Sequence, residues 1–251
     1  VLTSSRASWA PRKQRGNMLD SGLSTIDALL RDRTRFLDAL QSGGIGAAGA
    51  RGLIACIAVA GAVLGAALGS YRGGEQVLFA AVKLPLAILA TAALCAPIVV
   101  ALGKSLTGEA QWARSFLLLL ASLALGSLVA AALAPVLLLA IQAGATYQQV
   151  TLILLGACCV GGLSGLVLFA RGLAGIVVRA RLLAALVLVC AFCVVATQVT
   201  WTLRPFLVRP RTVAVPFVRD IEGSFVDDAV RSFESSLGRY RRAEAPLPLA
   251  R

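Results

Sequence analysis

Five long apolar runs constrain the fold of this chain more than any other feature of its sequence. Each is close to the length of about 20 helical residues that crosses a hydrocarbon core ~30 Å thick. A helix satisfies its backbone hydrogen bonds internally, so such runs cross a membrane as helices. The sequence therefore predicts an all-α integral membrane protein with a bundle of about five transmembrane helices. The runs are Gly52–Ser70, Leu84–Gly103, Ser115–Ile141, Val150–Ala170 and Leu182–Leu203.

Composition and charge agree with a membrane location. Hydrophobic residues make up 58% of the 251 residues and charged residues 14%, whereas soluble domains average about 45–50% and about 25%. The net charge is +12, and the basic residues lie in the termini and loops beside the apolar runs. There they would meet the anionic headgroups of a lipid bilayer. We therefore expect the bilayer, and not nucleic acid, to be the partner of this charge.

The runs divide the chain into four segments. We expect residues 1–20 to be a flexible basic N-terminus, and residues 21–44 to form an amphipathic interfacial helix. Residues 45–204 form the transmembrane domain. Residues 205–251 form a basic C-terminal tail with a second amphipathic helix around Ser224–Tyr240.

In the first amphipathic segment, apolar residues recur at helical spacing, and Ser24 with Asp27 resembles a capping box at the start of the helix. Two interpretations remain open for this helix. It lies in the plane of the membrane surface, or its apolar face packs against a protein. The glycines of Ser42–Gly46 predict its end. The apolar face consists of Ile26, Leu29, Leu30, Phe36, Leu37 and Leu40.

Prolines set the expected limits of two spans. Pro85 suits the first turn of a helix, where its missing N–H is not needed. We therefore expect the second span to begin beside it, with Lys83 at the membrane surface and Val77–Val82 in a short surface turn. Pro135 lies within the long third run and predicts a tilt or kink there.

The loop charges predict an orientation. Loops after the second and fourth runs carry Lys104, Arg114, Arg171, Arg179 and Arg181, whereas those after the first and third carry Arg72 and the boundary Lys83. The positive-inside rule then places the N-terminus in the cytoplasm, in what we interpret as a bacterial inner membrane. Arginines 204, 209 and 211 oppose this rule, because they follow the fifth run on the outer side. The expected interface anchors are Tyr71, Lys83, Tyr147, Trp201 and Arg204.

Small residues recur every four positions in three of the runs. Such stripes let helix backbones approach closely, and this contact drives helix association in lipid. The sequence leaves open whether these contacts lie within one chain or between subunits of a homo-oligomer or of a complex with other membrane proteins. The predicted helix-packing glycines are Gly61, Gly65, Gly69, Gly126, Gly161 and Gly165.

The sequence offers little material for catalysis. It contains no histidine, and the five runs contain no aspartate or glutamate. The six cysteines all lie in apolar runs, where they suit packing better than metal or redox chemistry. We therefore expect a non-enzymatic protein with no catalytic, cofactor or metal site.

The fifth run carries a weak polar stripe, which consists of Cys193, Thr197, Gln198 and Arg204. One interpretation is a pore lining that favours anions, because the stripe leads to an arginine. The alternative is that these side chains hydrogen-bond to neighbouring helices or to their own backbone.

Three short motifs carry a resemblance: "GSYRGGEQ", "VKLPLAILATAALCAP" and "WTLRPF". They resemble a group of uncharacterised polytopic bacterial membrane proteins, and more loosely Yip1-like five-span proteins. The resemblance implies five spans and offers no catalytic residues, and the likeness to Yip1-like proteins implies membrane-shaping or trafficking contacts by analogy. We expect an assembly, scaffold or accessory subunit of a membrane complex, with a homo-oligomeric channel as the alternative.

Overall fold

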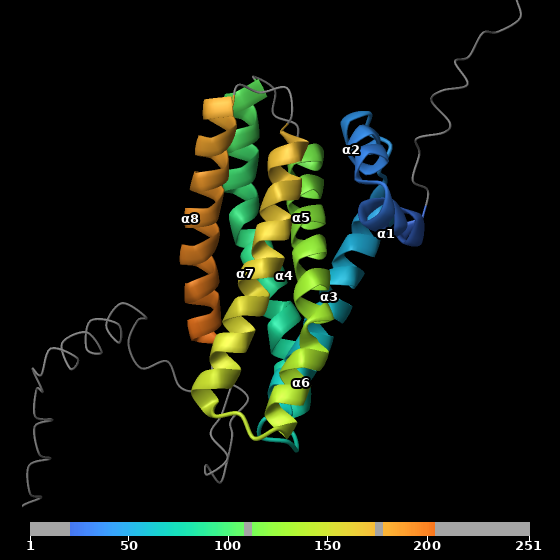
Figure 1. Ribbon diagram of the computed structural model, residues 1–251. Coiled ribbons are helices and arrows are strands. Elements are labelled where there is room, and N and C mark those ends of the chain that lie inside the picture. The colour runs from blue at the N-terminus through green and yellow to red at the C-terminus, as the bar shows by residue number, and fades with distance from the viewer. Residues whose placement is uncertain (1–20, 108–111, 174–177, 204–251) are drawn as a thin grey trace, which may run out of the picture.

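The computed structural model describes residues 21–107, 112–173 and 178–203, and every regular element in these ranges is a helix (Figure 1). Five helical segments of 23 to 31 residues are long and apolar enough to cross a membrane, which confirms the predicted all-α bundle. These spans are α3 (Ala47–Gly69), α4 (Gln76–Thr107), α5 (Trp112–Ala132) continued by α6 (Ala134–Gln142), α7 (Tyr147–Gly172) and α8 (Val178–Thr202).

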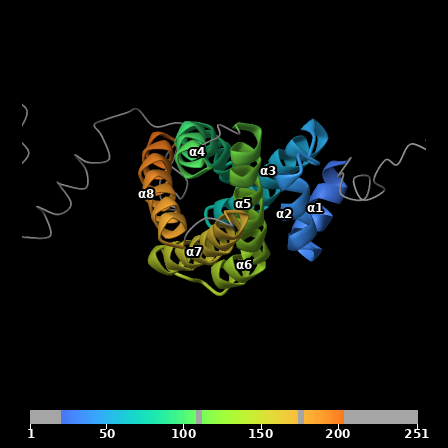
Figure 2. The ribbon, with the colours of Figure 1, turned by 90° about the horizontal axis from the view of Figure 1, so that it is seen from above.

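The spans alternate in direction, so that α3, α5 and α8 begin at the end of the bundle where α4 and α7 finish (Figure 1). Seen from above, α5 lies between α3, α4 and α7 (Figure 2). Its buried residues, among them Leu119, Leu120 and Leu125, form the centre of the main hydrophobic core. Helix α8 lies at the edge and packs mainly against α4.

The N-terminal segment forms two short helices, α1 (Gly22–Arg31) and α2 (Arg33–Gln41), which lie beside the start of α3 (Figure 1). Leu29, Phe36 and Leu40 are buried in the same core as residues of α3 and α5. The chain itself therefore covers most of the apolar face for which the sequence left two interpretations open. Leu30, expected on that face, is 48% exposed.

The start of this segment differs from the predicted capping box. The cap is Ser21, whose hydroxyl accepts a hydrogen bond from the Ser24 N–H at 3.1 Å, while the Ser24 hydroxyl accepts one from the Ser21 N–H at 3.3 Å. Asp27 instead forms an ion pair with Arg31 at 2.8 Å. The helix therefore begins one turn earlier than predicted, because serine at the third helical position completes the box as glutamate would.

Asp32 divides the segment into two helices. Its carboxylate accepts hydrogen bonds from the Thr34 hydroxyl at 2.7 Å and from the Arg35 N–H at 3.0 Å. These bonds stabilise the charged form and lower the pKa of Asp32 from its usual 3.8. The single helix expected from the spacing is therefore interrupted, because aspartate here caps a new helix.

Helix α4 begins earlier than the sequence indicated. The chain turns at Gly73 and Gly74, whose φ angles are 79° and 62°, and α4 then runs unbroken from Gln76 through Pro85. The prediction of a surface turn over Val77–Val82 is therefore wrong. Lys83, which was expected to anchor the chain at the membrane interface, lies two turns inside the helix and is 0% exposed.

The predicted kink at Pro135 is confirmed. Helix α5 ends at Ala132, and α6 begins at Ala134 with Pro135 in its first turn. The Leu133 N–H bonds the carbonyl of Ala130 at 3.1 Å, a tightened turn between the two helices. Because proline lacks an N–H, the break falls just before it.

The burial of Lys83 gives a direct test of the α4 register. An amine-reactive ester should modify Lys104, which is exposed, and leave Lys83 unmodified in the folded protein. Peptide mass spectrometry gives the extent of modification at each lysine, and prior denaturation, which exposes both, is the control. Equal modification of the two in the folded protein would contradict the burial of Lys83.

Candidate functional site

The glycines of α3 bring its backbone against α4. A Cβ built on Gly61 would lie 3.0 Å from the Cα of Pro85, and one on Gly69 would lie 2.5 Å from the carbonyl oxygen of Gln76. A Cβ on Gly65 would meet the carbonyl of Ala80. Real side-chain atoms do not approach backbone as closely as at Gly65 and Gly69, so only glycine fits there without a shift of α4, and Gly61 leaves no spare room.

The same kind of contact joins α5 to α7. A Cβ on Gly126 would lie 2.9 Å from the carbonyl oxygen of Gly161, and a Cβ on Gly161 would meet the carbonyl of Gly126 in return. One on Gly165 would lie 2.5 Å from the carbonyl oxygen of Ser122. All six glycines singled out in the sequence therefore lie at contacts between helices of the same chain.

Helix α7 also carries small residues on its outer face. Cys158 and Cys159 are exposed there, and within the described part of the chain nothing comes within 4 Å of a Cβ built on Gly156 or Gly162. This outer face was not predicted, although adjacent small residues such as Gly161-Gly162 signal it. Neighbouring helical residues point about 100° apart, so a pair of small residues supplies two different faces.

The polar stripe of α8 is divided by the structure. Cys193 and Gln198 are exposed, whereas the Thr197 hydroxyl donates a hydrogen bond to the Cys193 carbonyl at 2.6 Å. The Thr202 hydroxyl likewise bonds the Gln198 carbonyl at 3.0 Å. The threonine hydroxyls are thus satisfied by their own helix, as the second interpretation of the stripe requires. Arg204 and the side chain of Trp201 lie outside the described residues.

Two predicted interface anchors meet at one end of the bundle. The rings of Tyr71, after α3, and Tyr147, at the start of α7, pack edge to face with their centroids 6.4 Å apart. This geometry is favourable for aromatic pairs. The contact joins two loops that are far apart in the sequence.

Lys83 lies on a buried face of α4. Ionisable side chains inside membrane spans are rare and mark functional positions in many membrane proteins. Lys83 was expected at the membrane surface because Pro85, two residues later, suits the first turn of a helix. The other buried members of this face are Gln76, Ala80, Ala87 and Thr91.

Charge is distributed unequally between the two ends of the bundle. At the end where α3, α5 and α8 begin, basic side chains outnumber carboxylates, and we call this the charged end (Figure 1). The opposite end carries Arg72 and Glu75 in its described loops. The basic residues at the charged end are Arg31, Arg33, Arg35, Arg51, Lys104, Arg114, Arg171 and Arg179, and the carboxylates are Asp27, Asp32 and Asp38.

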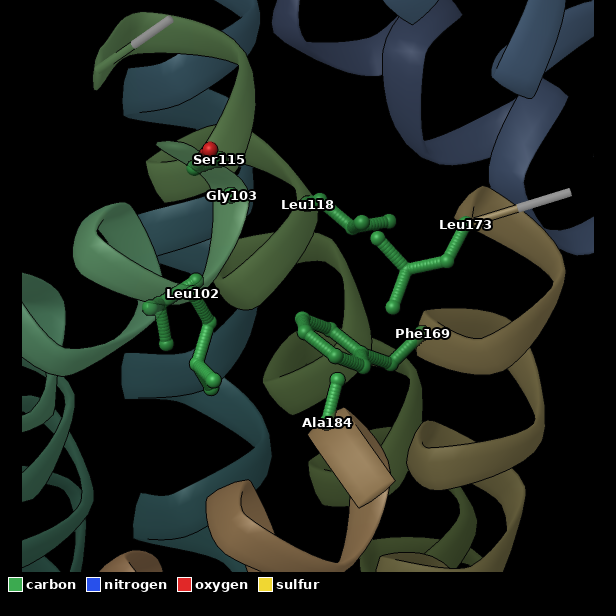
Figure 3. Close-up of a pocket in the computed structure, with 8 residues that line it drawn as sticks. Leu102, Gly103, Ser115, Leu118, Phe169, Leu173 and Ala184 are labelled. Atoms are coloured by element: carbon green, nitrogen blue, oxygen red, sulfur yellow. The ribbon is translucent and has the colours of Figure 1, made fainter. Parts of the chain in front are cut away.

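A small cavity lies inside the charged end, between α4, α5, α7 and α8 (Figure 3). Its volume is about 20 Å³, and its walls include Leu118, Phe169, Leu173 and the Ser115 hydroxyl. A space of this size admits one water molecule, whereas small-molecule sites occupy about 300–1,000 Å³. This cavity is therefore a packing defect and not a ligand site.

A larger groove of about 370 Å³ opens at the charged end, between the end of α2 and the start of α5. We call it the α2–α5 groove. The sequence does not reveal this groove, because the residues of its two walls lie some seventy positions apart in the chain. They consist of Leu40, Gln41, Gly43, Ile45, Trp112, Ala113, Arg114 and Leu117.

No family model matches the chain, and no curated protein or solved structure is significantly similar to it. The resemblance to uncharacterised bacterial membrane proteins therefore stays a prediction. Within the described residues, no three histidine, cysteine, aspartate or glutamate side chains gather as a metal site would require.

One glycine on the contact face of α3 and one on the open face of α7 give a matched pair of substitutions. Gly65→Ala should lower the stability of the solubilised monomer by about 1–3 kcal/mol, since the new methyl meets the rigid backbone of α4. Gly162→Ala, on the open face of α7, should leave stability unchanged or raise it slightly. Thermal unfolding in detergent measures both. Equal destabilisation by the two would contradict the assigned contact.

Proposed function

We propose that this chain is a non-enzymatic subunit of a membrane complex and assembles laterally through the outer faces of α7 and α8. The observation that carries the proposal is the two-faced character of α7. Its inner glycines are occupied by α5, while Gly156 and Gly162, about 120° apart on the outer part of the helix, have open space among the described residues. Small residues at such positions let a helix of another subunit approach α7 closely.

Helix α8 supports the same surface. Of the five spans, α3 has 56% of its most apolar stretch buried within the chain, whereas α8 has 17%. The uncovered face of α8 includes Gln198 as well as large apolar residues. An amide side chain on a membrane helix gains from a hydrogen-bond partner on another helix. A neighbouring subunit would supply that partner.

The distribution of charge supports an orientation for this subunit. We infer that the charged end faces the cytoplasm of a bacterial cell, because basic residues are retained on that side of the membrane. This orientation places α1 and α2 on the cytoplasmic side, and Tyr71 with Tyr147 at the outer surface. A role in organising a membrane complex also agrees with the resemblance to Yip1-like proteins.

Native cysteines test the assembly surface. We expect a variant that keeps only Cys193, or only Cys159, to form disulfide-linked adducts when native membranes are oxidised, because both residues are exposed on the proposed surface. A variant that keeps only Cys56, which is buried, is the matched control and should form none. Non-reducing electrophoresis and mass spectrometry identify the adducts.

The identity of the adduct decides the kind of assembly. Adducts with other polypeptides indicate an accessory subunit, and adducts of two identical chains indicate a homo-oligomer. If neither exposed cysteine cross-links, and native mass spectrometry of the gently extracted protein shows a monomer, the proposed assembly is wrong. A closed ring of identical chains would instead favour the homo-oligomeric channel.

Introduced cysteines test the orientation in the full-length chain. In intact cells, a membrane-impermeant maleimide should label Gly144→Cys, between α6 and α7, and should not label Gln41→Cys, at the end of α2. Both positions are exposed, and the bundle places them at opposite ends. Permeabilised cells, in which both should react, provide the control. The reverse pattern in intact cells would place the charged end outside.

A further inference from the structure

The α2–α5 groove combines an apolar floor with a polar rim. Leu40 and Ile45 are 3% and 6% exposed and form part of its floor together with the half-buried Leu117. Gln41 and Arg114 supply polar groups. A soluble anion would need the arginine but not the apolar floor, so the groove suits a ligand with both kinds of surface.

The groove lies beside the start of the third apolar run, Ser115–Ile141, because Trp112 and Arg114 directly precede that run in the sequence. The indole of Trp112 is 62% exposed. Tryptophan is enriched at the boundary between headgroups and hydrocarbon, because its ring is apolar and its N–H needs a polar partner. A lipid molecule presents its own polar–apolar junction at this same depth.

Charge selects among lipids. Arg114 belongs to the charged end, where basic side chains outnumber carboxylates among the described residues. A guanidinium forms strong, charge-assisted hydrogen bonds with phosphate oxygens. A lipid with net negative charge also gains from the surrounding basic residues, whereas a zwitterionic lipid gains much less.

We propose that the α2–α5 groove binds one anionic phospholipid of the adjacent leaflet. The phosphate lies at Arg114 and Gln41, and the upper part of an acyl chain lies over Leu40, Ile45 and Leu117. Trp112 covers the junction between them. The volume of about 370 Å³ accommodates this part of the lipid, while the remaining hydrocarbon stays in the bilayer. The site is independent of the assembly surface on α7 and α8.

Native mass spectrometry of the full-length chain tests the site. The purified protein is titrated with phosphatidylglycerol and, separately, with phosphatidylcholine. We expect one phosphatidylglycerol to bind clearly more tightly than further copies, with no such preferred copy for phosphatidylcholine. Arg114→Gln should weaken the first phosphatidylglycerol by about tenfold, because it removes a charged hydrogen-bond donor.

Two further variants make the test decisive. Arg179→Gln removes an exposed charge from the same end on α8 and should change the first binding constant less than twofold, a difference on the order of ordinary surface effects. Trp112→Ala removes an exposed ring and should weaken binding while the melting temperature stays unchanged, so it serves if Arg114→Gln unfolds the protein. Three outcomes would overturn the proposal. Arg114→Gln and Arg179→Gln weaken the first binding step equally, Trp112→Ala leaves binding unchanged, or the protein binds both lipids equally well.

Discussion

Direct backbone contact between helices, made where glycine replaces a side chain, is the interaction on which this bundle depends. Inside a membrane, lipid is as apolar as leucine, so burial of apolar surface supplies little force for association. Dispersion contacts between closely packed atoms must supply it instead. The pairs α3–α4 and α5–α7 achieve this contact through Gly65 and Gly161, where even one methyl group would meet a carbonyl of the neighbouring helix.

These two pairs position the rest of the molecule. Helix α5 joins them, because it packs against α3 as well as α7, and its leucines fill the space between the pairs. The N-terminal helices extend the same core at the charged end through Leu29 and Phe36. Helix α8 packs mainly against α4, and the other described residues leave most of its surface uncovered. The proposed assembly surface and the α2–α5 groove lie outside the glycine contacts.

The sequence predicts the features of this fold that depend on local residues. Span number follows from the length of the apolar runs, and the break before Pro135 follows from its missing N–H. The helix break at Asp32 was not predicted, because aspartate is compatible with a helix interior as well as with a cap. The start of α4 was predicted wrongly, because Pro85 suits the first turn of a helix, whereas α4 begins at Gln76 and continues through this proline.

Features that depend on which helices contact each other could not be predicted from the sequence. The glycines indicated close contact, but whether Gly126 meets Gly161 or a second chain depends on the tertiary arrangement. The α2–α5 groove is formed by residues around Gln41 and Arg114, and no local pattern connects them. The open face of α7 could be predicted only in part. Its small residues are visible in the sequence, but its openness depends on where α5 lies.

The buried Lys83 has a consequence for the insertion of this protein into the membrane. When α4 leaves the ribosome, the later helices of the bundle do not yet exist, and nothing covers Lys83, which lies two turns from the start of the helix. A lysine at the centre of a lone membrane helix would cost about 2.5–3.5 kcal/mol, and one nearer the end costs less because it reaches the headgroups. The stretch Leu84–Gly103 is long enough to cross the membrane without it. Helix α4 can therefore insert with Lys83 near the membrane surface, and the later helices of the bundle then cover its side chain.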